Sequence, residues 1–217
     1  MEGPLQNPFL LFFTSFIFIG AYLIGSIPFG FLIAKLWKID IRLHGSKNIG
    51  ATNVWRVMGK KWGILVFILD FLKGYLPILL LLTFWNREAE INDHTLAVIA
   101  AIALILGHNH PIWLDFKGGK GIATSAGILV ALMPWSFLAA FSCWLIGFAI
   151  TRIVSVGSIL ACIALPLSTF FTYRNEPILL FFSLVAGSLG LLRHKSNISR
   201  LWAGEEKPLT SGPEKPS

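Results

Sequence analysis

The stretch FFTYRNEPILLFF, residues 170–182, places an arginine, an asparagine, a glutamate and a proline between two apolar runs. A charged arginine or glutamate is costly inside a bilayer, and proline interrupts a helix. These residues therefore predict a turn at the membrane surface that joins two separate spans. The dipeptide Met133-Pro134 indicates a second interruption of the same kind.

The chain as a whole has the composition of a membrane protein. Of its 217 residues 55% are hydrophobic and only 13% are charged, whereas a soluble domain carries about 25% charged residues. A helical span needs about 20 apolar residues. Three uninterrupted runs and the two interrupted ones provide them: Phe9–Ala34, Trp62–Trp85, Thr95–Trp113, Ile122–Ile150 and Ile159–Arg193. With both interruptions read as turns, the sequence predicts an all-α integral membrane protein with a bundle of seven transmembrane helices.

The distribution of positive charge predicts the orientation of this bundle. With seven crossings, every Lys and Arg lies on the side of the C-terminus except Lys73, Arg87 and Arg174. Cytoplasmic loops are enriched in these residues, so we expect the N-terminus outside and the C-terminus in the cytoplasm. Five crossings would give the tail the same location, but they would place the Arg174–Glu176 pair inside the membrane.

We expect one multi-spanning domain, residues 1–203, and a tail, residues 204–217. The tail is rich in Pro, Glu, Lys and Ser, which predicts a disordered and dispensable cytoplasmic segment. The first apolar run has no cation before it and no small-residue cleavage site, so we expect a permanent span. The isoelectric point near 9.7 reflects cations dispersed over several loops, which favours lipid headgroups over nucleic acid as partners.

The segment FKGGKG, residues 116–121, is a candidate anion site. A nucleotide-binding P-loop would need glycine in place of Leu114 and a hydroxyl in place of Gly121. The backbone amides of Gly118 and Gly119, with Lys120 directly before a predicted helix, can still hold an anion at a helix N-terminus. The alternative is an anchoring loop, which would need lysine but not three glycines.

The segment GSKNIGATNVWR, residues 45–56, offers a second candidate site. It contains several hydrogen-bonding side chains and two glycines, and no acidic residue lies between Ile41 and Leu69. Arg56 can bind a phosphate with two parallel hydrogen bonds, whereas Lys61 can act only as a point charge. The alternative is a solvated linker at the membrane interface.

Other polar residues give weaker signals. His194 and Asn197 are three residues apart and share a face if the last span continues as a helix. Spacing alone leaves open whether His194 is catalytic or contacts lipid headgroups, and it favours a helix cap for Ser155. Spacing also gives no support for a metal site at the two histidines of GHNHP or for a catalytic triad. Asp70 and Lys73, three residues apart in one span, indicate an internal ion pair.

Taken in order, the motifs GSIPFG, GSKNIGATNVWR, LDFLKGYLP, GHNHPIWLDFKGGKG, VSVGSI and RHKSNI closely resemble the bacterial acyl-phosphate-dependent glycerol-3-phosphate acyltransferase family, from about Gly25 to Leu201. The resemblance implies transfer of a fatty acyl group from acyl phosphate to the 1-hydroxyl of glycerol 3-phosphate. The product is lysophosphatidic acid, the first intermediate of phospholipid synthesis. It also implies a seven-helix bundle in the bacterial inner membrane, with a cytoplasmic active site and no metal or other cofactor. We expect a functional monomer whose partners are the two substrates and membrane lipids.

The resemblance also assigns site residues by matching motifs. It matches Ser46, Arg56, Lys120, Ser155, His194 and Asn197 to the family's functional residues. We therefore expect Lys120, His194 and Asn197 to be catalytic, and Ser46, Arg56 and Ser155 to bind substrate together with Gly118 and Gly119 of the candidate anion site. Two positions depart from the family pattern, since Lys47 replaces a usual glycine and Ser196 replaces a usual glutamate. The second departure removes a hydrogen-bonding acid next to His194.

A transporter of a phosphorylated anion is the alternative function, because basic loops also line permeation paths. Transporters usually bind their substrate near the middle of the membrane, between internal repeats. In this sequence the candidate residues gather at one predicted face, and we detect no repeat.

Overall fold

The computed structural model describes residues 8–84 and 93–209, and within these ranges the regular structure is helical. The helices are α1 (Pro8–Gly25), α2 (Phe29–Leu36), α3 (Ala51–Met58), α4 (Lys60–Phe84), α5 (Asp93–Asn109), α6 (Ile122–Leu132), α7 (Pro134–Thr151), α8 (Val154–Thr172), α9 (Pro177–Arg193) and α10 (Lys195–Trp202). Two short 3-10 turns, η2 (Ile41–Leu43) and η3 (Ile112–Leu114), lie in the connections.

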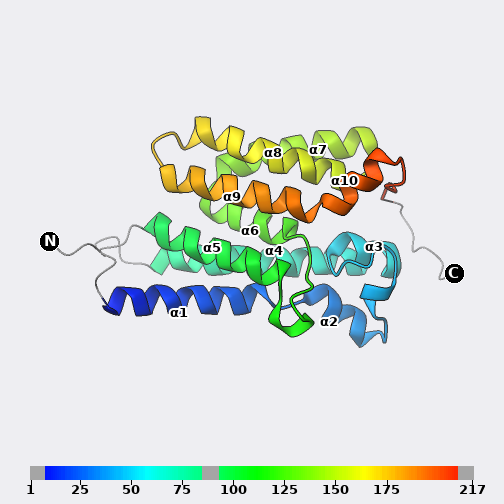
Figure 1. Ribbon diagram of the computed structural model, residues 1–217, viewed down its shortest axis with the longest axis horizontal. Helices are drawn as coiled ribbons and strands as arrows, with labels where there is room; N and C mark the ends of the chain where they lie inside the picture. Colours follow the sequence, from blue (N-terminus) through cyan, green and yellow to red (C-terminus); the bar gives the residue numbers. More distant parts are fainter. Residues whose placement is uncertain (1–7, 85–92, 210–217) are drawn as a thin grey trace.

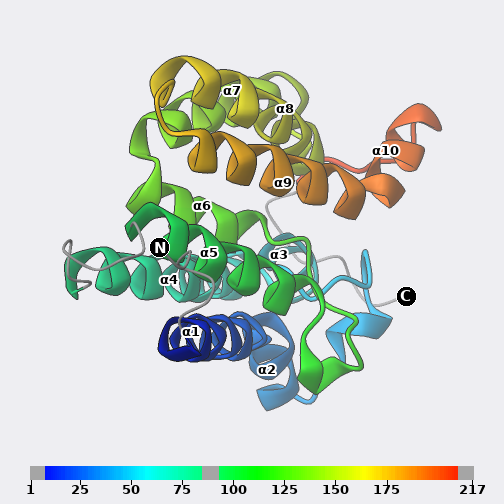
Figure 2. The ribbon, with the colours of Figure 1, turned by 60° about the vertical axis from the view of Figure 1, so that its left-hand side comes forward.

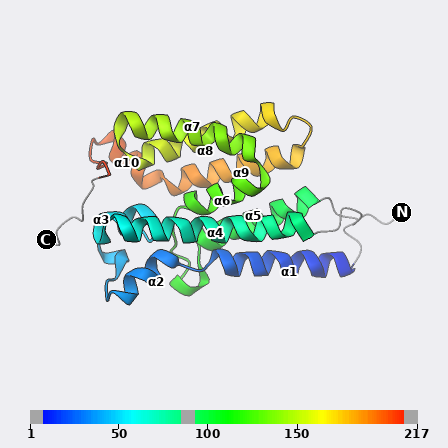
Figure 3. The same ribbon diagram turned by 180° about the vertical axis from the view of Figure 1, so that it is seen from behind.

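The long helices lie side by side in layers (Figure 1), and the view from behind shows the same order (Figure 3). The pair α7 and α8 forms one outer layer, and α1 lies at the opposite side with α4 and α5 above it. The view in Figure 2 shows α6 and α9 between these outer layers. The closest packing joins α7 with α8, α4 with α6 and α1 with α5.

Both predicted interruptions between spans are confirmed. α6 ends at Leu132 and α7 begins at Pro134, while α8 ends at Thr172 and α9 begins at Pro177. A proline at the first position of a helix has no intrahelical hydrogen bond to lose, which explains why both helices start there. Arg174 is exposed in the second turn, and Arg87 lies outside the described residues.

In the described residues, five helical segments are long and apolar enough to cross a membrane: Leu11–Leu36, Lys60–Phe84, His94–Leu114, Pro134–Thr151 and Val154–Thr172. α9 and α10, bent by 54° relative to each other, make a sixth if they form one span. α6 has only 11 residues, about 17 Å of helix, which is close to half of a hydrocarbon core. The structure therefore confirms an all-α, multi-spanning protein, in which five or six of the described segments qualify as spans by length and composition.

The first predicted span differs from the observed structure. It was expected to run unbroken from Phe9 to Ala34, but α1 ends at Gly25 and α2 begins at Phe29. Pro28 disfavours helical geometry in the residue before it, which accounts for the break. The break frees the carbonyl of Ile27, which accepts a hydrogen bond of 2.7 Å from Lys73 Nζ.

Polar segments gather at one end of the bundle. α1, α5, α7 and α9 run toward this end and α4, α6 and α8 run away from it, so α2, α3 and α10 lie there together (Figure 1). The turn between α8 and α9 lies at the opposite end. The convergence of four polar segments that the sequence suggested is therefore present, and we call this region the polar end.

The expectation of a disordered tail is wrong for residues 204–209. Glu206 is only 8% exposed, and the Leu209 amide donates a hydrogen bond of 2.9 Å to the carbonyl of Arg152. These contacts fold the segment back against the start of α8. Residues 210–217, the rest of the predicted tail, lie outside the described residues.

Asp70 and Lys73 form the predicted ion pair inside α4. The Lys73 Nζ atom lies 2.8 Å from Asp70 Oδ1, and both side chains are almost fully buried. The His108 ring of α5 lies near the same carboxylate, with Nδ1 at 3.7 Å from Oδ1. Because opposite charges compensate each other here, the pair can remain inside the apolar bundle.

Candidate active site

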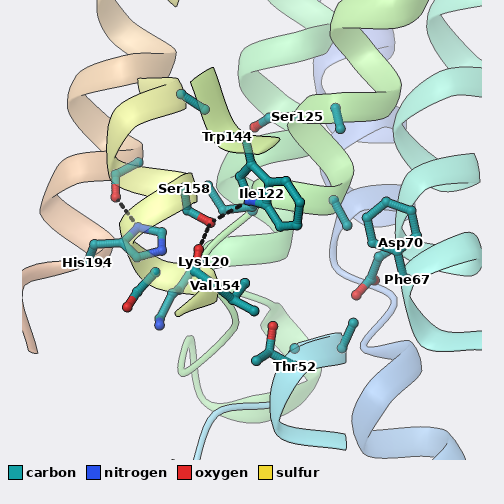
Figure 4. Close-up of a pocket in the computed structure, with 18 of the residues that line it drawn as sticks. Thr52, Phe67, Asp70, Lys120, Ile122, Ser125, Trp144, Val154, Ser158 and His194 are labelled. Carbon is teal, nitrogen blue, oxygen red and sulfur yellow. Dashed lines mark hydrogen bonds between the residues drawn. The ribbon is translucent and has the colours of Figure 1, made fainter. Parts of the chain in front are cut away.

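A cavity of about 430 Å³ lies at the polar end. Its walls come from the first loop (Gly45–Arg56), the glycine loop (Phe116–Gly121) and helices α4, α6, α7, α8 and α9. In Figure 4, Lys120 and His194 lie on one side of this space and Thr52 and Phe67 on the other. The cavity therefore joins segments that are up to about 160 residues apart in the chain.

The first loop is held in shape by Asn53, which is 1% exposed. Its Nδ2 atom donates to three backbone carbonyls, those of Ile41 at 3.2 Å, His44 at 3.1 Å and Asn48 at 2.8 Å. Its Oδ1 atom accepts from the Ser46 amide at 2.7 Å. Asn53 is one of the hydrogen-bonding side chains that made this segment a candidate site, but its hydrogen-bonding capacity is used within the segment.

Arg56, in the last turn of α3 at the end of this segment, reaches the cavity. It is 9% exposed, and its Nη2 atom donates to the carbonyl of Lys207 at 2.7 Å. Within the described residues its buried Nε atom has no hydrogen-bond partner. An unpartnered N–H of a buried guanidinium is costly, so an anion in the cavity would satisfy it. Ser46 also lines the cavity.

The glycine loop is built differently. The amides of Gly118 and Gly119 donate to the carbonyls of Asn109 at 3.1 Å and His108 at 3.0 Å. The prediction that these two amides hold an anion is therefore wrong, because they are already engaged, and neither glycine lines the cavity. Their carbonyls accept three hydrogen bonds from Arg193.

Lys120 points from this loop into the cavity, at the N-terminus of α6. Gly121 provides the left-handed turn, with φ of 82°, that starts the helix. Lys120 Nζ donates to Asn197 Oδ1 at 2.5 Å. Burial is the main cause that lowers the pKa of Lys120 to about 8, so its charge is poorly solvated without an anion.

His194 follows the last residue of α9 and is 2% exposed. Its Nδ1 atom lies 2.8 Å from the carbonyl of Gly190, and because a carbonyl can only accept, Nδ1 must carry the proton. Burial, reinforced by the charge of Lys120, lowers the pKa of His194 to about 4. The neutral ring therefore leaves Nε2 as a hydrogen-bond acceptor.

Glu206 completes the polar end, and the sequence analysis did not identify it. Its Oε1 atom accepts from Ser155 Oγ at 2.8 Å and from Asn197 Nδ2 at 2.6 Å. Its Oε2 atom accepts from Arg200 Nε at 2.6 Å. Burial raises the pKa of Glu206, but these hydrogen bonds outweigh it and the pKa lies below its ordinary value. In the sequence it is one of two adjacent glutamates in the segment that was expected to be a disordered tail.

The rest of the cavity is apolar and extends into the bundle. Its lining residues come from α4, α6, α7 and α8, and they include Phe67, Phe71, Leu129, Phe141, Trp144 and Leu165. Phe67 and Phe141 are also about half exposed on the outer surface of the bundle. The space can therefore hold a hydrocarbon chain that continues from the polar end.

Six of the eight predicted site residues line this one cavity: Ser46, Arg56, Lys120, Ser155, His194 and Asn197. Gly118 and Gly119 shape the loop behind it. Within the part of the chain that the structure describes, no three His, Cys, Asp or Glu side chains are grouped as a metal site. These features define a class of protein, a multi-spanning helical membrane protein with an anion-binding cavity that opens into an apolar one.

Comparisons with known proteins identify the family. The sequence profile described as glycerol-3-phosphate acyltransferase matches residues 15–204. The glycerol-3-phosphate acyltransferase of Desulforamulus reducens is 50% identical over 194 residues, which cover 89% of this chain and 94% of that protein. The enzyme of the same name from Aquifex aeolicus is 44% identical and covers 88% and 96%.

Solved structures agree with these matches. The chain is similar to PlsY (YgiH), described as an integral membrane glycerol 3-phosphate acyltransferase, in its glycerol 3-phosphate form, with a TM-score of 0.82, 42% identity and coverage of 91% and 96% of the two chains. The lysophosphatidic acid form of PlsY gives a TM-score of 0.80 at 41% identity, with the same coverage. The chain belongs to the glycerol-3-phosphate acyltransferase family.

Proposed function

We propose that this protein transfers a fatty acyl group from acyl phosphate to the 1-hydroxyl of glycerol 3-phosphate and so makes lysophosphatidic acid. The observation that carries the proposal is that one cavity joins a cationic end, with Arg56 and Lys120, to an apolar end within the bundle. The family membership and the glycerol 3-phosphate and lysophosphatidic acid forms of a relative support the same reaction.

Arg56 and Lys120 are proposed to neutralise the phosphates of the two substrates. Arg56 is buried and Lys120 is partly buried, both line the cavity, and the Nε atom of Arg56 has no hydrogen-bond partner among the described residues. Ser46 and Ser155 line the same space. Ser46 is proposed to donate to a phosphate oxygen, and Ser155 is proposed to do so by exchanging its hydrogen bond to Glu206 for one to phosphate. Because Arg56 and Lys120 are already in place before the substrate arrives, they stabilise charge with little reorganisation.

His194 and Asn197 are proposed to act on the acceptor hydroxyl. The Nε2 atom of neutral His194 can accept the hydroxyl hydrogen bond, and Asn197 can orient the reacting oxygen. The hydroxyl oxygen attacks the acyl carbon, the bond from that carbon to the phosphate oxygen breaks, and phosphate leaves with the hydroxyl proton. Acyl phosphate is a mixed anhydride with a good leaving group, so orientation and charge neutralisation supply most of the acceleration.

We further propose seven crossings in the bacterial inner membrane, with the N-terminus outside, the polar end and the C-terminus in the cytoplasm, and a functional monomer. The charge distribution and the alternating direction of the helices support this topology. α6 completes the count as a short crossing helix flanked by the glycine loop.

Turnover by the purified protein in detergent tests the reaction. With acyl phosphate and glycerol 3-phosphate, and with divalent metals chelated, we expect lysophosphatidic acid. Acyl-CoA should not support product formation, because the proposal needs phosphate as the leaving group. Equal rates with acyl-CoA would place the protein in another class of acyltransferase.

Labelling of single cysteines tests the topology. In a cysteine-free background, Lys47→Cys and Lys117→Cys should resist an impermeant thiol reagent in sealed cells and react after permeabilisation. Arg174→Cys, at the opposite end of the bundle, is the matched control and should react in sealed cells. Labelling of Lys117→Cys in sealed cells would overturn the proposed orientation.

A further inference from the structure

Arg193 does not line the cavity, yet it makes three hydrogen bonds to the glycine loop. Its Nε atom donates to the Gly119 carbonyl at 3.0 Å, and its Nη2 atom donates to the carbonyls of Gly118 at 2.9 Å and Gly119 at 2.7 Å. The planar guanidinium has several donors in a fixed arrangement, which suits two neighbouring carbonyls. The side chain of one helix end thus holds the backbone of a distant loop.

The same loop is held from the other side by the end of α5. The amides of Gly118 and Gly119 donate to the Asn109 and His108 carbonyls. A Cβ atom at Gly119 would collide with the His108 ring. The loop therefore lies between α5 and Arg193, with its amides bonded on one side and its carbonyls on the other.

This arrangement fixes both ends of Lys120. Its backbone follows Gly119 directly, so Arg193 determines where the side chain begins. Its Nζ atom donates to Asn197, which lies on α10, just beyond Arg193. Both supports of the lysine therefore come from the junction of α9 and α10.

We propose that Arg193 is a positioning residue, which holds the glycine loop so that Lys120 presents its charge to the reacting phosphate. The proposal rests on the proposed acyl transfer, and it assigns Arg193 no contact with a substrate. Lysine at this position would keep the positive charge but could not reproduce the three-bond arrangement. The effect of Arg193 on turnover should therefore depend on the presence of Lys120.

A double-mutant cycle with purified proteins in detergent tests this dependence. We expect Arg193→Lys to lower kcat/KM for glycerol 3-phosphate by about tenfold to a hundredfold, as expected for lost hydrogen bonds to a charged group. In the Lys120→Ala background the same substitution should change kcat/KM by less than about twofold. Arg174→Lys, an exposed arginine at the opposite end, is the matched control and should match the wild type.

Two results would overturn the proposal. The first is a wild-type kcat/KM in Arg193→Lys. The second is an equal loss of kcat/KM on this substitution with and without Lys120, which would indicate a general structural role. If the variant does not fold, Arg193→Ala purified with guanidinium ion provides a second test. Recovery of turnover as guanidinium is added supports the proposal, and no recovery in a folded protein overturns it. Failure of the wild type to make lysophosphatidic acid would instead refute the proposed function.

Discussion

The first loop and the glycine loop both meet the cavity, but they are built in opposite ways. In the first loop one side chain, Asn53, satisfies backbone carbonyls and an amide. In the glycine loop the backbone itself is engaged, through amides on α5 and carbonyls on Arg193. Each loop then presents one cation to the cavity, Arg56 or Lys120. In both loops, hydrogen bonds within the protein thus fix the shape from which Arg56 or Lys120 reaches the cavity.

The largest expected effect comes from removing either cation. Lys120→Ala and Arg56→Ala should each lower kcat/KM by about 10²–10³, by analogy with the loss of a preorganised oxyanion donor. Arg56→Lys should recover only part of the loss, since lysine keeps the charge without the planar fork. Steady-state kinetics on folded protein in detergent measures both. A normal rate for Lys120→Ala would contradict this role and indicate that the glycine loop only anchors the chain at the membrane surface.

A smaller effect should follow from breaking the support of the first loop. Asn53→Asp is almost isosteric but turns the three-carbonyl donor into an acceptor, so we expect a loss of about 1–3 kcal/mol in the free energy of unfolding. Thermal unfolding in detergent measures the change. Asn48→Asp is the matched control, because the Asn48 Oδ1 atom only accepts, from the Gly50 amide at 2.9 Å, and a carboxylate can do the same. Equal losses in the two variants would contradict the role assigned to Asn53.

A substitution in the glycine loop should lower activity by moving Lys120. A side chain at Gly119 would displace the His108 ring, and such overpacking costs about 1–3 kcal/mol. We expect Gly119→Ala to lower kcat/KM about tenfold by shifting the loop under Lys120. Gly50→Ala in the first loop is the comparison, since its Cβ would meet only Asn48 Oδ1, at 3.0 Å. If Gly50→Ala were the more damaging variant, the contrast between the loops would be wrong.

A pH dependence is the last expected effect, and it is small at pH values below about 8. The pKa of Lys120 is about 8 because the side chain is buried, so in the free protein its charge is lost as pH rises through 8. Phosphate binding weakens with it, and kcat/KM should fall by up to about tenfold per pH unit above that value. In Lys120→Arg the cation persists, and this alkaline decrease should disappear whatever the rate at pH 7. A decrease that is unchanged in Lys120→Arg would belong to another group.

Much of the fold could be predicted because apolar runs and prolines report on spans and turns directly. The break before α2 was not predicted, although Pro28 is visible in the sequence, because apolar residues continue on both sides of this proline. The short length of α6, 11 residues, was not predicted for a similar reason: composition marks an apolar helix but does not give its length.

The site was predicted less completely, because residue type does not reveal what a side chain faces. Arg56 and Lys120 were identified as cations near glycines, and both reach the cavity. Asn53 had the same polar character, yet it bonds its own loop. Glu206 and Arg193 were missed since their partners, Ser155 and the glycine loop, lie 51 and about 75 residues away in the chain. Only the fold brings these groups together.

The most direct test of the central claim is to follow lysophosphatidic acid and inorganic phosphate together in one reaction of the purified protein. Acyl transfer in the shared cavity predicts one phosphate released for each lysophosphatidic acid formed, with both rates falling together in Lys120→Ala. Phosphate release without lysophosphatidic acid would indicate hydrolysis of the donor. Glycerol 3-phosphate uptake into vesicles without either product would indicate a transporter, and either result would contradict the account.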